Sequence, residues 1–153
     1  MTISEKQRKN DLDNLALAQF WAMRKSKDPS TQLSAIITDR FNRVVGMGYN
    51  GFARGVEDTQ ERLQDRTTKY AMIVHAEPNA ILIAGDRCIG GTIYTWPLMT
   101  CSNCAALVIN SGISRVVSVM DKEREDRWDC DLSKIMFEEA GIDLCLYGTN
   151  DIE

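Results

Sequence analysis

The sequence predicts an α/β fold, a three-layer sandwich in which a mixed sheet of about five strands carries helices on both faces. Two observations lead to this prediction. After an opening helix and two short apolar runs, helix and strand patterns alternate regularly, which favours parallel neighbours in the second half of the sheet. The 153 residues are 44% hydrophobic and 26% charged, which suits one globular domain spanning 1–153.

The first half of the chain is expected to contain one helix and one hairpin. Apolar residues recur at spacings of three and four over 11–25, which predicts a helix that ends before Pro29. Two short apolar runs, 33–38 and 43–48, predict an antiparallel hairpin. Three closely spaced glycines indicate unusual dihedrals or a close approach of the backbone to another element. They are Gly46, Gly48 and Gly51. The polar stretch 56–69 is expected to be a solvated loop with one short helix.

The second half is expected to alternate helix and strand, with Pro78 in the first turn of its first helix. The expected elements are a helix at 78–84, a strand at 91–96, a helix at 102–110, a strand at 113–120, a helix at 132–140 and a strand at 142–147. The charged run 121–127 that precedes the last helix is typical of a solvated surface.

Charge and the N-terminal sequence narrow the classes of function. The net charge of -4 argues against a broad nucleic-acid surface, and no apolar run approaches the roughly 20 residues that cross a bilayer. The N-terminus is polar, without the apolar core of a secretory signal. An odd number of cysteines, five, favours a reducing compartment. We therefore expect a cytoplasmic protein with no nucleic-acid or membrane partner.

One histidine and two cysteines form a candidate metal site. His75 is the only histidine in the chain, and Cys101 and Cys104 have the Cys-x-x-Cys spacing. Two thiolates and one imidazole can hold a tetrahedral zinc ion and leave its fourth position open to water, which is typical of catalytic zinc. A structural zinc site is the alternative, and it would require a fourth ligand. The candidates for that ligand are Cys88, Cys130 and Cys145.

Glu77 stands two residues after the histidine, where it can exchange protons with a zinc-bound water. The combination of His-x-Glu and Cys-x-x-Cys is the pattern of the zinc nucleobase deaminases, whose activated water attacks an electron-poor carbon such as C4 of cytosine. Glu77 would then act as both base and acid, because it passes protons to the ring nitrogen and to the leaving ammonia. If the ligands begin helices, the helix dipoles would stabilise the thiolates.

Further segments extend this pattern beyond the zinc motifs. They are 26–32 (SKDPSTQ), 45–55 (VGMGYNGFARG), 75–81 (HAEPNAI) and 137–141 (FEEAG). With these segments the chain resembles the deoxycytidylate (dCMP) deaminases of the cytidine deaminase superfamily over about residues 12–147. The resemblance implies a cytidine-deaminase-like fold, a Zn²⁺ cofactor and a homohexamer. It also implies hydrolytic deamination of dCMP to dUMP, which feeds dTMP synthesis.

The resemblance assigns the residues at the reacting centre. It gives His75, Cys101 and Cys104 to zinc. Glu77 would transfer protons, and Ala76 would offer its backbone N–H to the pyrimidine carbonyl.

The resemblance also assigns residues to the nucleotide. Asn50 would hold the deoxyribose and base, and Ser26 would help to bind the 5′-phosphate. A guanidinium suits a dianionic phosphate, and Arg124 is expected to supply it, with Arg127 as the alternative. Trp96 would form a wall of the base pocket, although a core tryptophan is an equal alternative.

Many members of the family bind an allosteric deoxynucleotide, dCTP as activator or dTTP as inhibitor, together with Mg²⁺. Gly51 and Arg54 are the residues expected at such a site. The chain departs from the family pattern at two positions, Ala53 and Thr100, where the family usually has proline. Thr100 directly precedes the first cysteine, so this departure affects the rim of the pocket.

Three other functions remain open on the sequence. The altered loop 97–100 is compatible with a related substrate, such as dCTP or a modified dCMP. A catalytically silent nucleotide-binding or zinc-structural protein is a second alternative. An RNA-editing deaminase is a third, which the acidic charge balance disfavours.

Overall fold

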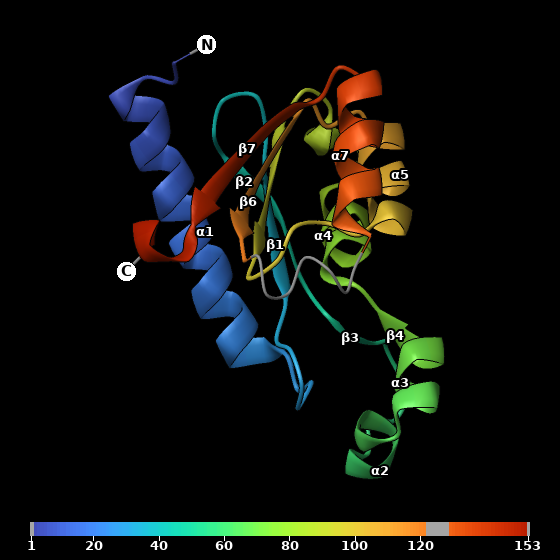
Figure 1. Cartoon of the computed structure of the whole chain (residues 1–153). Coiled ribbons are helices and arrows are strands. Elements are labelled where there is room, and N and C mark those ends of the chain that lie inside the picture. Colours follow the sequence, from blue (N-terminus) through green and yellow to red (C-terminus); the bar gives the residue numbers. More distant parts are fainter. Residues whose placement is uncertain (1, 122–128, 153) are drawn as a thin grey trace.

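The computed structural model describes residues 2–121 and 129–152, and a five-stranded sheet in the order β2-β1-β5-β6-β7 forms its centre. The strands are β1 (Ser34–Thr38), β2 (Val44–Tyr49), β5 (Thr92–Trp96), β6 (Arg115–Met120) and β7 (Asp143–Gly148). β1 is antiparallel to both of its neighbours, whereas β5, β6 and β7 are parallel. The prediction of a hairpin followed by a parallel half is therefore confirmed (Figure 1).

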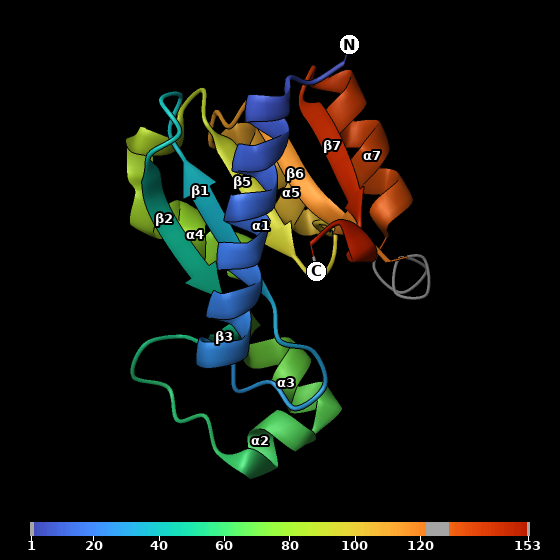
Figure 2. The same ribbon diagram turned by 90° about the vertical axis from the view of Figure 1, so that its left-hand side faces the viewer.

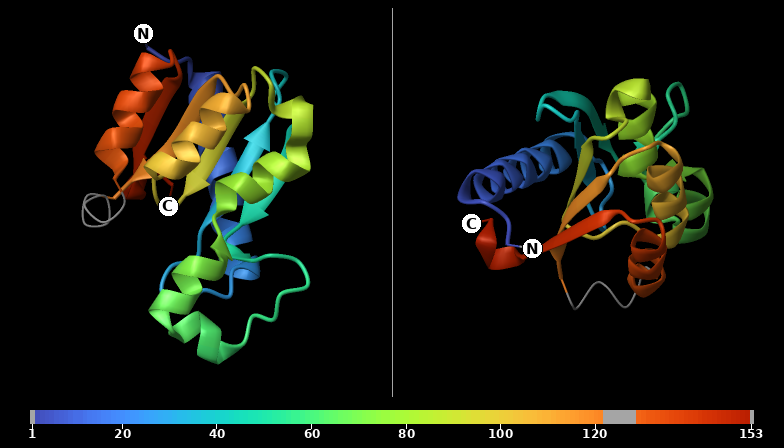
Figure 3. Two further views of the ribbon diagram at one scale, coloured as in Figure 1. Left: turned by 90° about the vertical axis from the view of Figure 1, so that its right-hand side faces the viewer. Right: turned by 90° about the horizontal axis from the view of Figure 1, so that it is seen from above.

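Helices cover both faces of the sheet, as the sequence predicts. One face carries α1 (Glu5–Lys25). The other carries α4 (Ala76–Ala84), α5 (Ser102–Asn110) and α7 (Cys130–Glu139). Figure 3 shows this second layer from the front and the three layers from above. Two short 3₁₀ helices, η1 (Gly85–Cys88) and η2 (Thr149–Asp151), follow α4 and β7.

A separate apolar cluster fills the space on each side of the sheet. On the α1 side the buried members are Leu15, Ala18, Ile36, Tyr94, Val117, Val119 and Tyr147. On the other side Ala76, Ala80, Ala105, Val108 and Phe137 of the helices meet Ala35, Ile37, Ile93 and Val116 of the sheet. Successive strand residues point to opposite faces, so each central strand contributes to both clusters.

The first helix begins earlier than the apolar spacing predicts. Ser4 is its N-cap, and the Ser4 side chain accepts a hydrogen bond from the backbone N–H of Gln7. The first turns of α1 are largely polar, so they give no hydrophobic signal. None of the helices in the described ranges is long and apolar enough to span a lipid bilayer.

Two of the three clustered glycines allow α4 to approach the sheet closely. A Cβ atom on Gly48 would overlap the backbone of Ala76 and Ala80, and one on Gly46 would overlap the Ala80 carbonyl. The prediction of a close backbone approach is confirmed for these two glycines, and it fixes the first turn of α4 against β2. Gly51 has no such neighbour, since only the ring of Tyr49 lies near its hypothetical Cβ.

The polar stretch after the glycines differs from the expected solvated loop with one short helix. It contains two helices, α2 (Gln60–Gln64) and α3 (Arg66–Met72), which extend beyond the end of the sheet (Figure 2). They are flanked by two short paired strands, β3 (Gly51–Phe52) and β4 (Ile73–Val74). Leu63 and Lys69 are buried within this region. The hydrophobic pattern did not predict the second helix, because charged side chains in this stretch outnumber the apolar ones that anchor the helices.

Candidate active site

The three candidate metal ligands lie at the N-termini of two neighbouring helices. His75 is the N-cap residue of α4 and Cys101 is the N-cap residue of α5, both with extended backbone dihedrals. Cys104 lies in the first turn of α5 and is buried. The ligand groups therefore lie at helix N-termini, as expected from the sequence, and the dipole of α5 favours a thiolate at its first residue, Cys101.

The donor atoms of these residues have the spacing of a metal site. The Nδ1 atom of His75 lies 3.6 Å from Cys101 Sγ and 3.3 Å from Cys104 Sγ, and all three donors lie within 4.8 Å of one another. Bonds of about 2.3 Å to sulfur and about 2.0 Å to nitrogen place neighbouring donors of a tetrahedral zinc roughly 3.5–3.8 Å apart. The donor set and its spacing therefore fit zinc.

Charge at the thiols is unevenly divided. A hydrogen bond from Cys104, supported by His75, lowers the pKa of Cys101 to about 4. The same contact with Cys101, together with burial, raises the pKa of Cys104. The hydrogen bond with Cys101 raises the pKa of His75. A thiolate at Cys101 would attract a cation, and a metal held by the three residues would require both cysteines to be deprotonated.

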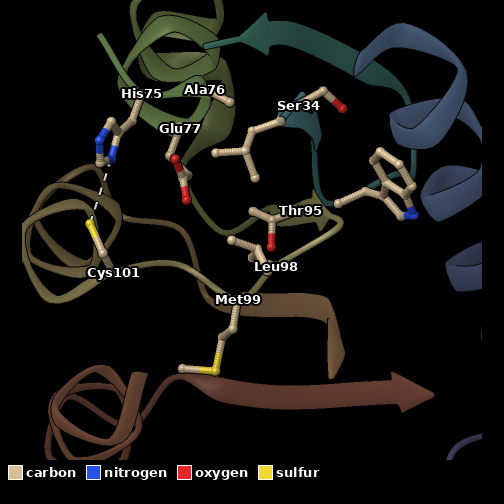
Figure 4. A pocket seen from close by; sticks show the side chains of 10 residues that line it. Ser34, His75, Ala76, Glu77, Thr95, Leu98, Met99 and Cys101 are labelled. Atoms are coloured by element: carbon tan, nitrogen blue, oxygen red, sulfur yellow. Dashed lines mark hydrogen bonds between the residues drawn. The ribbon is translucent and has the colours of Figure 1, made fainter. Parts of the chain in front are cut away.

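Glu77 lies in the first turn of α4 and is 8% exposed. Its carboxyl group points into the cavity beside His75, as Figure 4 shows. Burial raises the pKa of Glu77, and the negative charge at Cys101 adds to this effect. A buried carboxyl group beside a metal site, with a raised pKa, is well suited to accept and return a proton.

The cavity is mainly apolar and joins the sheet to the metal cluster. Its lining residues are Leu33, Ser34, His75, Ala76, Glu77, Thr95, Trp96, Leu98, Met99 and Cys101. Ala76 is the first residue of α4, so its N–H lacks an intrahelical partner and can serve a ligand. Trp96 is half-buried, lines the cavity and also packs against the apolar cluster on the α1 side, so both interpretations of this residue stay open.

Ser26 and Asn50 lie together, but they bind each other. The Ser26 hydroxyl donates a hydrogen bond of 2.6 Å to Asn50 Oδ1, and the two side chains are only 5% and 2% exposed. Ser26 borders an open polar groove that also contains Trp96. The Ser26 hydroxyl and the Asn50 amide are therefore largely buried and engaged with each other.

The remaining predicted residues are dispersed. Gly51 borders a polar cavity that also contains Lys25 and Lys27, whereas Arg54 is exposed on the following turn. Arg124 and its alternative Arg127 lie outside the described residues.

Two buried charged residues near the site were not singled out from the sequence. Lys69 and Asp28 form an ion pair of 3.1 Å, and their side chains are 5% and 7% exposed. Asp28 lies within the segment 26–32 that carries the resemblance, so that segment could have drawn attention to it. Lys69 gave no signal, because it follows a run of charged residues that is typical of a solvated surface.

Comparisons with known proteins agree with this geometry. Residues 8–120 match the family described as "Cytidine and deoxycytidylate deaminase zinc-binding region". A deaminase of Aliivibrio fischeri is 41% identical over 124 residues, which cover 78% of this chain and 81% of that protein. The deoxycytidylate deaminase of Homo sapiens is 35% identical over 130 residues, which cover 80% of this chain and 71% of the human protein.

A solved structure supports the fold. The dCMP deaminase of the cyanophage S-TIM5 in its apo form superposes with a TM-score of 0.69 over 95% of this chain and 100% of the phage protein, at 13% sequence identity. Three findings lead to the same family. The family model matches most of the chain, two relatives exceed 30% identity, and the His-Cys-Cys cluster fits zinc. The chain belongs to the zinc-dependent cytidine and deoxycytidylate deaminases.

Proposed function

We propose that this chain catalyses the hydrolytic deamination of dCMP to dUMP and ammonia, as a single deaminase domain. The observation that carries this proposal is the position of Glu77, a buried carboxyl group in one cavity with His75 and Cys101. The human relative, a deoxycytidylate deaminase, supports the choice of nucleotide.

The residues of the cavity divide the chemistry among them. A zinc ion held by His75, Cys101 and Cys104 would supply Lewis-acid activation of a water molecule. Glu77 accepts a proton from the attacking water and delivers it to the ring nitrogen N3. It then moves the second proton to the amino group, so that the C4–N bond breaks, ammonia leaves and a C4 carbonyl remains.

Other residues orient the base and exclude water. The backbone N–H of Ala76 donates to the pyrimidine carbonyl, since this N–H is free of the helix ladder. Trp96 and Leu33 form apolar walls against the ring. The 5′-phosphate lies towards the groove bordered by Ser26, and Arg124 completes its charge neutralisation.

We also propose regulation and self-association. Gly51 and Arg54 bind an effector, dCTP or dTTP with Mg²⁺, and the exposed guanidinium of Arg54 suits its phosphates. Exposed apolar side chains on α4, α5 and α7 support a homohexamer. They are Leu82, Ile83, Leu107, Leu132 and Ile135. None of the five cysteines, which all lie in the described ranges, is part of a disulfide, and this suits a cytoplasmic location. Sedimentation at several protein concentrations tests the hexamer, and a monomer throughout would contradict it.

A related substrate, dCTP or a modified dCMP, is a second candidate. Leu98 and Met99, from the loop that departs from the family pattern, are buried and line the cavity. This loop therefore shapes the wall that faces the substrate.

A substrate panel tests the proposed function. Ammonia release is measured from dCMP, dCTP, cytidine and deoxycytidine, each with and without added dCTP or dTTP as effector. We expect dCMP to have the highest kcat/KM, and effectors to change its KM. A preference for dCTP would favour the second candidate, whereas activity only on unphosphorylated nucleosides would contradict the proposal. An inactive protein that binds these nucleotides would indicate the catalytically silent alternative.

A further inference from the structure

Lys69 is a deeply buried cation beside the candidate active site. Its ammonium group contacts Asp28 Oδ1 at 3.1 Å and Ser30 Oγ at 3.3 Å, and the residue is 4% exposed. Lysines are almost never buried without a partner, because the desolvation of an unpaired charge is strongly unfavourable. The ion pair joins α3 to the segment 26–32.

Asp28 also accepts hydrogen bonds from the backbone of its own segment. Its Oδ1 atom accepts the N–H groups of Ser30 at 2.8 Å and Thr31 at 3.2 Å. Its Oδ2 atom accepts from the side-chain amide of Asn50 at 3.4 Å. One carboxylate therefore fixes the turn after Pro29 and links it to the residue that follows β2.

Asn50 completes the network. Its Oδ1 atom accepts from Ser26 Oγ at 2.6 Å and from the backbone N–H of Leu33 at 2.9 Å. Its amide nitrogen donates to the carbonyl of Thr31 at 2.9 Å and to Asp28. Two acceptor positions and two donor hydrogens are the whole capacity of an asparagine amide. All four are engaged within the chain, so Asn50 acts here as an organiser of the backbone.

The network borders the cavity system of the active site. Asp28, Asn50 and Lys69 line a small cavity together with Leu33 and His75. Leu33 also lines the cavity that contains Glu77. The segment 26–32 thus lies between the buried network and the open groove next to Trp96.

We propose that Lys69 is a positioning residue for nucleotide binding. Through Asp28 and Asn50 it holds the segment 26–32 in the conformation that receives the sugar and phosphate. It does not touch the reacting atoms, so it sets KM and leaves the proton transfer of Glu77 unchanged. The inference rests on the proposed function, because it takes a nucleotide as the ligand.

The first test is kinetic and uses the full chain with zinc. Lys69→Met keeps the length of the side chain but removes the charge, and it should raise KM for dCMP by about tenfold or more, with kcat within about twofold of wild type. Lys9→Met is the matched control, because Lys9 pairs with Asp13 on the exposed surface of α1. This control should leave both constants unchanged. A soluble Lys69→Met protein with wild-type KM would overturn the proposal.

A second variant covers the case in which Lys69→Met does not fold. Lys69→Met/Asp28→Asn removes both charges, so no unpaired ion is buried. It should fold and still show a raised KM, since the tie between α3 and the segment is lost. A wild-type KM in this variant, or a fall in kcat as large as the rise in KM, would overturn the proposal.

Amide hydrogen exchange separates this inference from the proposed function. Without any nucleotide, the N–H groups of Ser30 and Thr31 should exchange at least about tenfold faster in the double variant than in wild type. Amides of the central strand β1 should be unchanged. If the wild-type protein failed to deaminate dCMP, the proposed function would fall, whereas unchanged exchange at Ser30 and Thr31 would overturn the positioning role itself.

Discussion

The metal end of the site and the network beneath the segment 26–32 are built in different ways. At the metal end, His75 and Glu77 come from one helix N-terminus, and Cys101 and Cys104 come from another. The network instead joins a loop, the end of β2 and α3, and its main contacts, Lys69 to Asp28 and Asn50 to Asp28, link residues distant in sequence.

Because of this difference, substitutions in the two regions should have different effects. The first residues of a helix are positioned by local backbone geometry. One substitution at the metal end should therefore change the catalytic activity and leave the fold intact. A buried network of charges depends on every partner, because each unpaired group bears the full cost of desolvation. Substitutions there should alter binding and stability together.

The largest effect should come from Glu77→Gln. Glutamine keeps the shape of the side chain but cannot accept and return the proton, so kcat for dCMP should fall by about 10²–10⁴-fold. Zinc content, measured by elemental analysis, should remain that of wild type, because Glu77 is not among the three clustered donors. Turnover that survived this substitution would contradict the assigned role of Glu77.

A second buried ion pair provides a control for the network. Asp11 is fully buried on the α1 side, and its carboxylate accepts hydrogen bonds from Arg115 at 2.7 and 2.9 Å. The Tyr147 hydroxyl adds a third at 2.8 Å. Asp11→Asn should reduce the free energy of unfolding by about 3–5 kcal/mol, since it leaves Arg115 poorly paired. Denaturant unfolding measures this loss of stability. KM for dCMP should not change in Asp11→Asn. A raised KM would mean that the two ion pairs do not differ in their effect on binding.

The same carboxylate should make stability depend on acid. Burial pushes the pKa of Asp11 upward, but hydrogen bonds from Arg115, Gln7 and Tyr147 outweigh it and the pKa is lowered. A lowered folded pKa means that the stabilisation is complete above the ordinary value of about 3.9 and is lost as pH falls through the lower folded value. Unfolding measured between pH 2 and 6 should show this loss in wild type, and a flatter profile in Asp11→Asn.

Sequence predicted the metal end much better than the network. The spacing of His75 and the cysteines is local, and Pro78 marked the start of the helix that follows. Alternation of helix and strand was enough to predict the sheet. The burial of Lys69 could not be predicted, because its neighbours are charged and only the folded chain brings Asp28 beside it. Asp11 gave no signal either, since a carboxylate on a largely polar helix turn is typical of an exposed surface.

Asn50→Ala tests whether Asn50 organises the backbone or only contacts a ligand. The substitution leaves the Leu33 N–H, the Thr31 carbonyl and the Asp28 carboxylate without this partner. We expect a loss of about 1–3 kcal/mol in the free energy of unfolding. Thermal and denaturant unfolding of the nucleotide-free protein measure it. A residue that only contacts the nucleotide would leave this stability unchanged while raising KM, and that result would remove Asn50 from the network.

The smallest effect should come from Thr100. This residue directly precedes the ligand Cys101 and, like the residues of the network, is polar and buried. Its hydroxyl is fully buried and makes no hydrogen bond of good geometry with any described residue. It faces the Glu77 carboxyl, whose pKa it lowers against the larger effect of burial.

Thr100→Val keeps the shape of the side chain, so the free energy of unfolding should stay the same or rise by about 1 kcal/mol, since an unsatisfied group is removed. At the same time kcat should fall by several-fold, up to about tenfold, because the Glu77 carboxyl loses the neighbouring hydroxyl that lowers its pKa. Thr100→Ser restores the hydroxyl and should recover kcat. A variant with valine that is both as active as wild type and more stable would mean that the residue at this departure from the family pattern only fills space.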